Sequence, residues 1–191
     1  SRRVARGGIV GSGTMGGGIA MCFANAGLPV TVVDISAEAL QRGLGVVDAN
    51  YESMVKRGRL TAEDKAKRMA LITGSLDYAD LGDADVIIEA AVERMDLKKA
   101  VFAKLDAVAK PGAVLATNTS TLDIDELATA VTRPQDVIGM HFFSPANVMP
   151  LLEVIRTKST SAECIRTALD LAKPLRKTPV LARVCYGFIG N

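Results

Sequence analysis

Six residues near the N-terminus constrain this chain more than any other feature. The segment 11–16, GSGTMG, follows an apolar run at 4–10 and opens a helical pattern at 14–26. A second apolar run at 30–35 completes a strand–helix–strand unit. A glycine pattern in this context predicts a dinucleotide-binding turn. The alternative is a glycine-rich strand-to-helix turn that binds no ligand.

Each glycine of this turn has a mechanical role. Gly11 allows the tight turn, Gly13 lets the backbone approach a pyrophosphate at the helix N-terminus, and Gly16 permits close packing of helix on strand. The cofactor contacts predicted in the turn are Gly11, Gly13, Thr14, Met15 and Gly16.

Asp34 ends the second strand, 18 residues after Gly16. At this position a carboxylate can accept hydrogen bonds from the adenosine ribose hydroxyls and repel a 2′-phosphate. Ile35 and Ser36 follow rather than an arginine, so the sequence favours NAD over NADP. For Asp34 taken alone, a helix cap or an exposed turn position is the alternative.

The rest of the chain alternates between short apolar runs and helical patterns. A helical stretch starts at Ser36, breaks at Gly58 and resumes at the capping box of Thr61 and Asp64, which predicts a helical hairpin over about 36–70. A further helix is expected at 96–109, and further strands at 71–73, 86–89, 114–117, 137–142, 151–155 and 178–182. This alternation predicts an α/β fold. We expect one domain, 1–191, with a Rossmann-like doubly wound, mostly parallel sheet and an inserted helical hairpin.

Composition narrows the possible partners. The formal net charge of +2 provides no general basic field for nucleic acid. Cys22, Cys164 and Cys185 are odd in number and widely separated, which argues against a disulfide framework or a zinc site and favours a reducing, cytoplasmic location. No apolar run approaches the ~18 residues of a membrane span. We expect a soluble protein with no metal, nucleic-acid or membrane partner.

His141 is the single histidine and ends an apolar segment just before Ser144 and Pro145. In a doubly wound sheet such strand ends form the ligand crevice. Oxidation of a secondary alcohol needs a base for the hydroxyl proton, and histidine titrates in the useful range. A histidine satisfied within the core is the alternative.

Two other polar residues could act with this histidine. Glu153 lies in an apolar run and needs a partner if it is buried, which an imidazole N–H of His141 would supply. An outward-facing position on an edge strand is the alternative for Glu153. Ser120, in an Asn-Thr-Ser-Thr segment, could hydrogen-bond the nicotinamide or a substrate oxygen, or could cap the helix that begins near Asp123.

Together these features resemble the 3-hydroxyacyl-CoA dehydrogenase family, from about Val4 to Asn191. The matching motifs, in family order, are GSGTMGGG at 11–18, EAAVERM at 89–95, NTSTL at 118–122, HFFSP at 141–145, LEVI at 152–155 and GFIGN at 187–191. The resemblance implies that NAD is the cofactor. It also implies oxidation of L-3-hydroxyacyl-CoA to 3-ketoacyl-CoA, in fatty acid β-oxidation or a related acyl-CoA pathway.

The resemblance assigns roles to residues. It implies that His141 is the base and Glu153 its orienting carboxylate, and that Ser120 and Asn191 position the substrate oxygen. It implies contacts with NAD for four residues: Asp34, Glu93, Lys98 and Ser120.

The resemblance also places coenzyme A along the helical hairpin. Its phosphates would meet one or more of four residues: Ser53, Lys56, Arg57 and Arg59. The alternative for this cationic stretch is a solvated helix face.

Two positions depart from the family pattern. Ser144 stands where many members carry Asn, and Tyr186 precedes GFIGN where a small or acidic residue is commoner. The serine is similar to the variant in multifunctional enzymes that also carry an enoyl-CoA hydratase, so a fused hydratase is an expected partner. Family members continue past Asn191 into an all-helical domain that closes the acyl cleft and makes the dimer. We therefore expect a piece of a longer homo-oligomeric protein, poorly active alone.

Two other functions are consistent with parts of the sequence. One is a different β-hydroxyacid dehydrogenase, which shares the glycine fingerprint but relies on a lysine base rather than a His–Glu pair. The other is a nucleotide-binding or structural module of the same fold without turnover. The set of Ser120, His141, Glu153 and Asn191 argues against the second.

Overall fold

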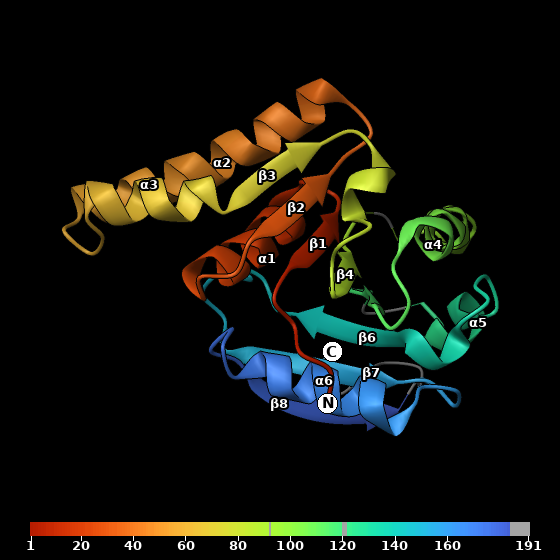
Figure 1. Cartoon of the computed structure of the whole chain (residues 1–191). Coiled ribbons are helices and arrows are strands. Elements are labelled where there is room, and N and C mark those ends of the chain that lie inside the picture. The colour runs from red at the N-terminus through yellow and green to blue at the C-terminus, as the bar shows by residue number, and fades with distance from the viewer. Residues whose placement is uncertain (92, 120–121, 184–191) are drawn as a thin grey trace.

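The computed structural model describes residues 1–91, 93–119 and 122–183 and is built around one sheet (Figure 1). The eight strands of this described part are β1 (Gly7–Val10), β2 (Val30–Val33), β3 (Ile72–Ser75), β4 (Val86–Glu89), β5 (Val114–Thr117), β6 (Val137–Phe142), β7 (Leu151–Arg156) and β8 (Thr178–Arg183). Their order is β3-β2-β1-β4-β5-β6-β7-β8, and each neighbouring pair is parallel except β6 with β7. The predicted doubly wound, mostly parallel sheet is confirmed.

Helices connect the strands and cover both faces of the sheet (Figure 1). They are α1 (Thr14–Asn25), α2 (Ala37–Lys56), α3 (Ala62–Ala70), α4 (Met95–Val108), α5 (Ile124–Ala128) and α6 (Ala162–Ala172), with short 3-10 turns η1 (Tyr78–Leu81) and η2 (Pro134–Asp136). In the described residues, none of the helices is long and apolar enough to cross a membrane.

The central strands are apolar on both sides because each side faces helices. Ile9 of β1 lies in the same core cluster as Phe23 of α1, whereas its neighbour Val10 lies in the cluster of Phe102 and Leu105 of α4. Parallel sheets covered on both faces show this unbroken apolar pattern rather than alternation.

The helical hairpin is formed by α2 and α3, which extend beyond the β3 edge of the sheet (Figure 1). Ser36 caps α2, because its hydroxyl accepts a hydrogen bond from Ala39 N at 3.1 Å. Thr61 caps α3 in the same way and accepts from Asp64 N at 3.0 Å. Both helix starts agree with the sequence prediction.

The first strand begins later than its apolar pattern predicts, at Gly7 rather than Val4. The backbone N–H groups of Ala5 and Arg6 donate to Asp85 Oδ2 at 2.7 and 3.0 Å. Those donors therefore bond a side chain that precedes β4 instead of a neighbouring strand. The second strand ends at Val33, before Asp34 and the exposed Ile35.

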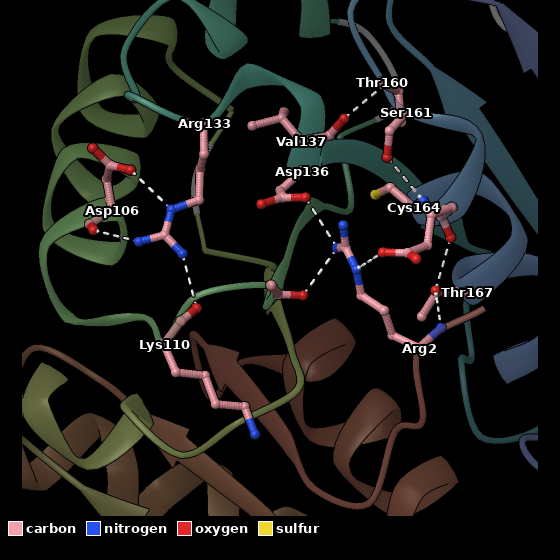
Figure 2. Close-up of polar contacts among 12 residues, drawn as sticks. Arg2, Asp106, Lys110, Arg133, Asp136, Val137, Thr160, Ser161, Cys164 and Thr167 are labelled. Carbon is pink, nitrogen blue, oxygen red and sulfur yellow. Dashed lines mark hydrogen bonds and ion pairs between the residues drawn. The ribbon is translucent and has the colours of Figure 1, made fainter.

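The N-terminal segment crosses the amino ends of the parallel strands, opposite the edge that holds the glycine turn. The Arg2 guanidinium lies 3.0 Å from Asp136 and 2.6 Å from Glu163, and it donates to Gly112 O at 2.9 Å (Figure 2). Arg2 N donates to Thr167 Oγ1 at 2.9 Å. One arginine thus joins α6 to the loops that precede β5 and β6.

Candidate functional site

The glycine turn joins β1 to α1 at the carboxyl edge of the sheet. Gly11 has a φ of 105°, which favours glycine. A Cβ on Gly16 would lie 1.8 Å from Gly11 O, whereas a Cβ on Gly13 would meet nothing within 4 Å. The exposed backbone at Gly13 and Thr14 therefore borders open space at the N-terminus of α1, as a bound pyrophosphate requires. Met15 instead packs partly against the core.

Asp34 turns back toward this glycine turn. Ser12 N donates to Asp34 Oδ2 at 3.0 Å, the Ser12 hydroxyl contacts the same oxygen, and Ile35 N donates to Oδ1 at 2.7 Å. Burial alone would raise the pKa of Asp34, but these hydrogen bonds and the charge of Arg42 together lower it. Asp34 is thus an ionised acceptor beside the turn, and Ser36 rather than Asp34 caps α2.

A cavity adjoins Asp34 and includes a cation that the sequence interpretation missed. Gly13, Thr14, Asp34 and Arg42 all line it. Arg42 lies on α2, one turn beyond the helix start, and only the folded hairpin brings it to the glycine turn. The donor and acceptor set fits a dinucleotide: backbone N–H groups for phosphate and a carboxylate for ribose hydroxyls.

The next strand end carries a fully buried ion pair. Glu89, the last residue of β4, accepts from Lys98 Nζ at 2.5 Å, from Thr117 Oγ1 at 2.8 Å and from Ala91 N at 2.8 Å. Lys98 is only 1% exposed. The ammonium group of Lys98 is therefore paired with the buried carboxylate of Glu89. Its predicted contact with NAD stays a prediction.

The loops after β4 and β5 are joined at the same edge. Thr119 Oγ1 donates to Glu93 Oε2 at 2.9 Å, and Glu93 is exposed. Asn118 Oδ1 accepts from Phe142 N at 2.7 Å, which fixes the end of β6 next to these loops. The contact of Glu93 with NAD stays a prediction, supported by this position.

His141 and Glu153 face each other across the antiparallel pair β6 and β7. His141 Nδ1 lies 3.2 Å from Glu153 Oε1, and the ring of Phe143 packs against the imidazole with centroids 4.7 Å apart. Glu153 is completely buried, and β8 covers the outer side of β7, so the edge-strand alternative for Glu153 is wrong.

This contact determines the chemistry available to the imidazole. A carboxylate oxygen accepts hydrogen bonds, so in the tautomer in which His141 donates to Glu153 the hydrogen is on Nδ1 and Nε2 keeps a lone pair. The other carboxylate oxygen, Glu153 Oε2, has no hydrogen-bond partner in the described part of the chain. Among the described residues, His141 is therefore the hydrogen-bond partner of this buried carboxylate, and it can act as a base at Nε2.

A second cavity lies between α2 and the loop that follows β6. Three of the four residues predicted to meet coenzyme A line it: Ser53, Arg57 and Arg59. Lys56, the fourth, is exposed and does not line it. Pro145 and Val148 form the opposite wall, a few residues after His141.

Some predicted residues lie outside the described residues. These are Ser120 and Asn191, together with Cys185 and Tyr186. Within the described ranges, no group of three or more His, Cys, Asp or Glu could hold a metal ion.

Comparison with known proteins gives the family of this domain. The family model of the 3-hydroxyacyl-CoA dehydrogenase NAD binding domain matches residues 7–185. The chain belongs to this family. NAD is accordingly the cofactor of the domain.

Relatives with longer chains contain the same domain. A peroxisomal bifunctional enzyme from Cavia porcellus is 44% identical over 192 residues, covering 100% of this chain and 26% of the relative. The fatty acid oxidation complex subunit alpha of Psychrobacter cryohalolentis is 42% identical over 183 residues, covering 96% and 26%. The chain thus spans about a quarter of the length of the curated relatives it matches.

Solved structures share the fold closely. The 3-hydroxybutyryl-CoA dehydrogenase of Escherichia coli K12 superimposes with a TM-score of 0.96 at 41% identity, covering 98% of this chain and 40% of that one. The (S)-3-hydroxybutyryl-CoA dehydrogenase of Ralstonia eutropha gives 0.95 at 41% identity, covering 98% and 66%.

Proposed function

We propose that this domain supplies the NAD site and the catalytic base for oxidation of L-3-hydroxyacyl-CoA to 3-ketoacyl-CoA. The observation that carries the proposal is the buried contact of His141 Nδ1 with Glu153 Oε1 at 3.2 Å. This contact lies on strands β6 and β7, and β6 is next to β5 in the sheet. The loop after β5 is hydrogen-bonded to the loop after β4. NAD, when bound, accepts the hydride that leaves the alcohol carbon.

His141 takes the hydroxyl proton at Nε2 as the substrate carbonyl forms. Glu153 holds the ring by its Nδ1–H and stabilises the imidazolium that results. Asn118 supports this geometry, because its side chain bonds Phe142 N directly after the base. Ser120 and Asn191 are proposed to position the substrate oxygen.

The proposed cofactor contacts follow from the two strand ends at the glycine turn. Backbone N–H groups at Gly13 and Thr14 would bind the pyrophosphate at the start of α1. Asp34 would accept from the ribose hydroxyls, since a carboxylate has about four acceptor positions and three are in use here. Glu93 would lie along the same edge.

The acyl-CoA substrate would occupy the cavity of Ser53, Arg57 and Arg59, which begins beside the loop after His141. The relatives named as a peroxisomal bifunctional enzyme and a fatty acid oxidation complex subunit support a place in fatty acid β-oxidation. Their greater length supports a larger protein with further domains. We propose that these include a helical domain and a fused hydratase and that the whole protein is a homo-oligomer. The cytoplasmic location stays a prediction, because several relatives are named as peroxisomal or glyoxysomal.

The test is reduction of acetoacetyl-CoA by NADH in the complete protein and its His141→Gln variant. Loss of the base should lower turnover by ~10²-fold or more, since a positioned acid–base group contributes about 10²- to 10⁴-fold. NADH affinity, measured by fluorescence titration, should stay at the parental value. Parental turnover in the variant, or binding of NADH without any turnover in the parent, would contradict the proposal.

A further inference from the structure

A third cavity lies beside the proposed substrate cavity, on the side of the segment that joins α6 to β8. Three guanidinium side chains line it: Arg59, Arg68 and Arg176. It shares Arg59 and Asn147 with the neighbouring cavity, so the two hollows are continuous along the hairpin. Residues that are far apart in the sequence thus bring three positive charges to one place.

These three charges lack counter-ions in the described residues. Other arginines, such as Arg2 and Arg133, lie 3.0 and 3.1 Å from the carboxylates of Asp136 and Asp106. Arg68 instead donates to the neutral Asn25 Oδ1 at 3.1 Å and lies over the ring of Tyr51. Among the described residues, no ion pair includes Arg59, Arg68 or Arg176, so the cavity is a site of net positive potential.

Arg176 occupies a backbone position that suits glycine. Its φ is 57°, and among the described residues it is the one residue other than glycine with a positive φ. The position ends α6, with Arg176 N donating to Lys173 O and Lys177 N donating to Ala172 O. Glycine is the usual residue at such a helix end, because it adopts this conformation without strain. An arginine that is strained at a cavity wall points to a use for its side chain.

The next residue fixes this wall. Lys177 is buried, and its ammonium group donates to Ala146 O and Met149 O at 2.6 Å each. These carbonyls belong to the loop that follows β6 and lines both cavities. Lys177 therefore fixes the position of Arg176 relative to the loop that follows β6 and His141. A rigid support of this kind is what a binding site needs.

We propose that Arg59, Arg68 and Arg176 bind the 3′-phosphate at the nucleotide end of the acyl-CoA. The inference rests on the proposed function and adds the group that recognises the phosphorylated nucleotide. Guanidinium groups suit phosphate because their planar N–H donors match its oxygens in pairs. Arg68 and Arg176 thereby become specificity-determining residues outside the cavity first assigned to coenzyme A.

The test is calorimetric titration of the parent, Arg176→Gly and Lys173→Gln with coenzyme A and with 3′-dephospho-coenzyme A. The parent should bind coenzyme A at least about tenfold more tightly, as charged hydrogen bonds of this kind allow. Arg176→Gly should lose most of that preference and keep its fold, because glycine relieves the positive φ. Lys173→Gln removes an exposed charge three residues away and should keep the preference.

Four results would overturn the inference. They are equal affinities of the parent for the two compounds, a preference retained in Arg176→Gly, an equal loss in Lys173→Gln, and binding of inorganic phosphate alone as tight as that of coenzyme A. The last result would make the cavity a site for a free anion. If neither coenzyme bound the parent, the proposed function itself would fail; equal binding of both would overturn only the phosphate assignment.

Discussion

Glu89 and Glu153 are both completely buried on strands of one sheet, but their carboxylates have very different partners. Glu89 accepts from an ammonium group, a hydroxyl and a backbone N–H at 2.5 to 2.8 Å. Among the described residues, Glu153 has one hydrogen-bond partner, the imidazole of His141, and its Oε2 has none.

The difference indicates that Glu89 has a structural role and that Glu153 has a role in the proposed reaction. The Glu89 pair with Lys98 is internally compensated, so it joins β4, α4 and β5 whatever the state of the site. Glu153 instead meets the imidazole at one oxygen, opposite the Nε2 that would take a proton from substrate. Its position is therefore that of a carboxylate that orients a base.

The largest expected effect is on turnover in Glu153→Gln. The amide can still contact the imidazole but cannot stabilise its charge, so acetoacetyl-CoA reduction by the complete protein should fall by ~10²- to 10⁴-fold. NADH affinity should not change, because the glycine turn and Asp34 are on other strands. Turnover within a few-fold of the parent would show that the second buried carboxylate is also only structural.

For Glu89→Gln we expect the largest effect on the free energy of unfolding rather than on turnover. Removal of one partner from a buried ion pair leaves Lys98 charged and unpaired, at a cost of about 3–5 kcal/mol in the free energy of unfolding. Urea denaturation of the 191-residue chain measures this. The matched variant Glu153→Gln should lose less than about 1.5 kcal/mol, a single net hydrogen bond. Equal losses in the two variants would remove the distinction between them.

The sequence predicts these two carboxylates unequally. The strands 86–89, 114–117 and 137–142 agree with the structure to the residue, since each is a short apolar run buried on both faces. The pairing of His141 with Glu153 follows from a buried acid that needs a donor. The pairing of Glu89 with Lys98 does not, because the lysine lies on an otherwise amphipathic helix and its burial depends on the packing of α4.

Other misses also arise from long-range contacts. Asp85 takes the N–H groups of Ala5 and Arg6, about 80 residues away in sequence, and so shortens β1. Arg42 approaches Asp34 only once the hairpin is folded. The positive φ of Arg176 opposes the local preference for glycine, so no propensity indicates it.

An effect of intermediate size is expected on cofactor choice. Asp34 is a third carboxylate, half-buried and hydrogen-bonded by Ser12 and Ile35, with Arg42 on the same cavity. In Asp34→Ala the ribose acceptor is lost and Arg42 can contact a 2′-phosphate, so the preference for NADH over NADPH should fall by about tenfold or more. Fluorescence titrations with both nucleotides measure it. The double variant with Arg42→Gln should bind NADPH more weakly than Asp34→Ala; equal affinities of the parent for both nucleotides would contradict the role of Asp34.

The smallest effect is expected at Asp85, a partly exposed carboxylate at the opposite end of the strands. Burial alone would raise its pKa, but hydrogen bonds from Lys110 and from the N–H groups of Ala5 and Arg6 lower it below the ordinary 3.8. Because the folded pKa lies below the unfolded one, the stabilisation is present above the unfolded value. It is lost as the pH falls through the folded pKa.

Asp85→Asn should therefore unfold more easily than the parent by about 1 kcal/mol at pH 7, reduced by the solvent exposure of the ion pair. The difference should shrink as the pH falls below about 4, where the unfolded parent takes up a proton on Asp85 first, and it should vanish below the lower folded pKa. Urea denaturation at pH 7 and pH 3 measures both values. Asp83→Asn is the matched control, because Asp83 is 71% exposed and lies 3.5 Å from Arg6, so its loss should change little at either pH. A difference for Asp85→Asn that is the same at both pH values would mean that its hydrogen-bond geometry, not its charge, holds the N-terminal segment. Asp85 would then resemble neither Glu89 nor Glu153, whose roles both depend on charge.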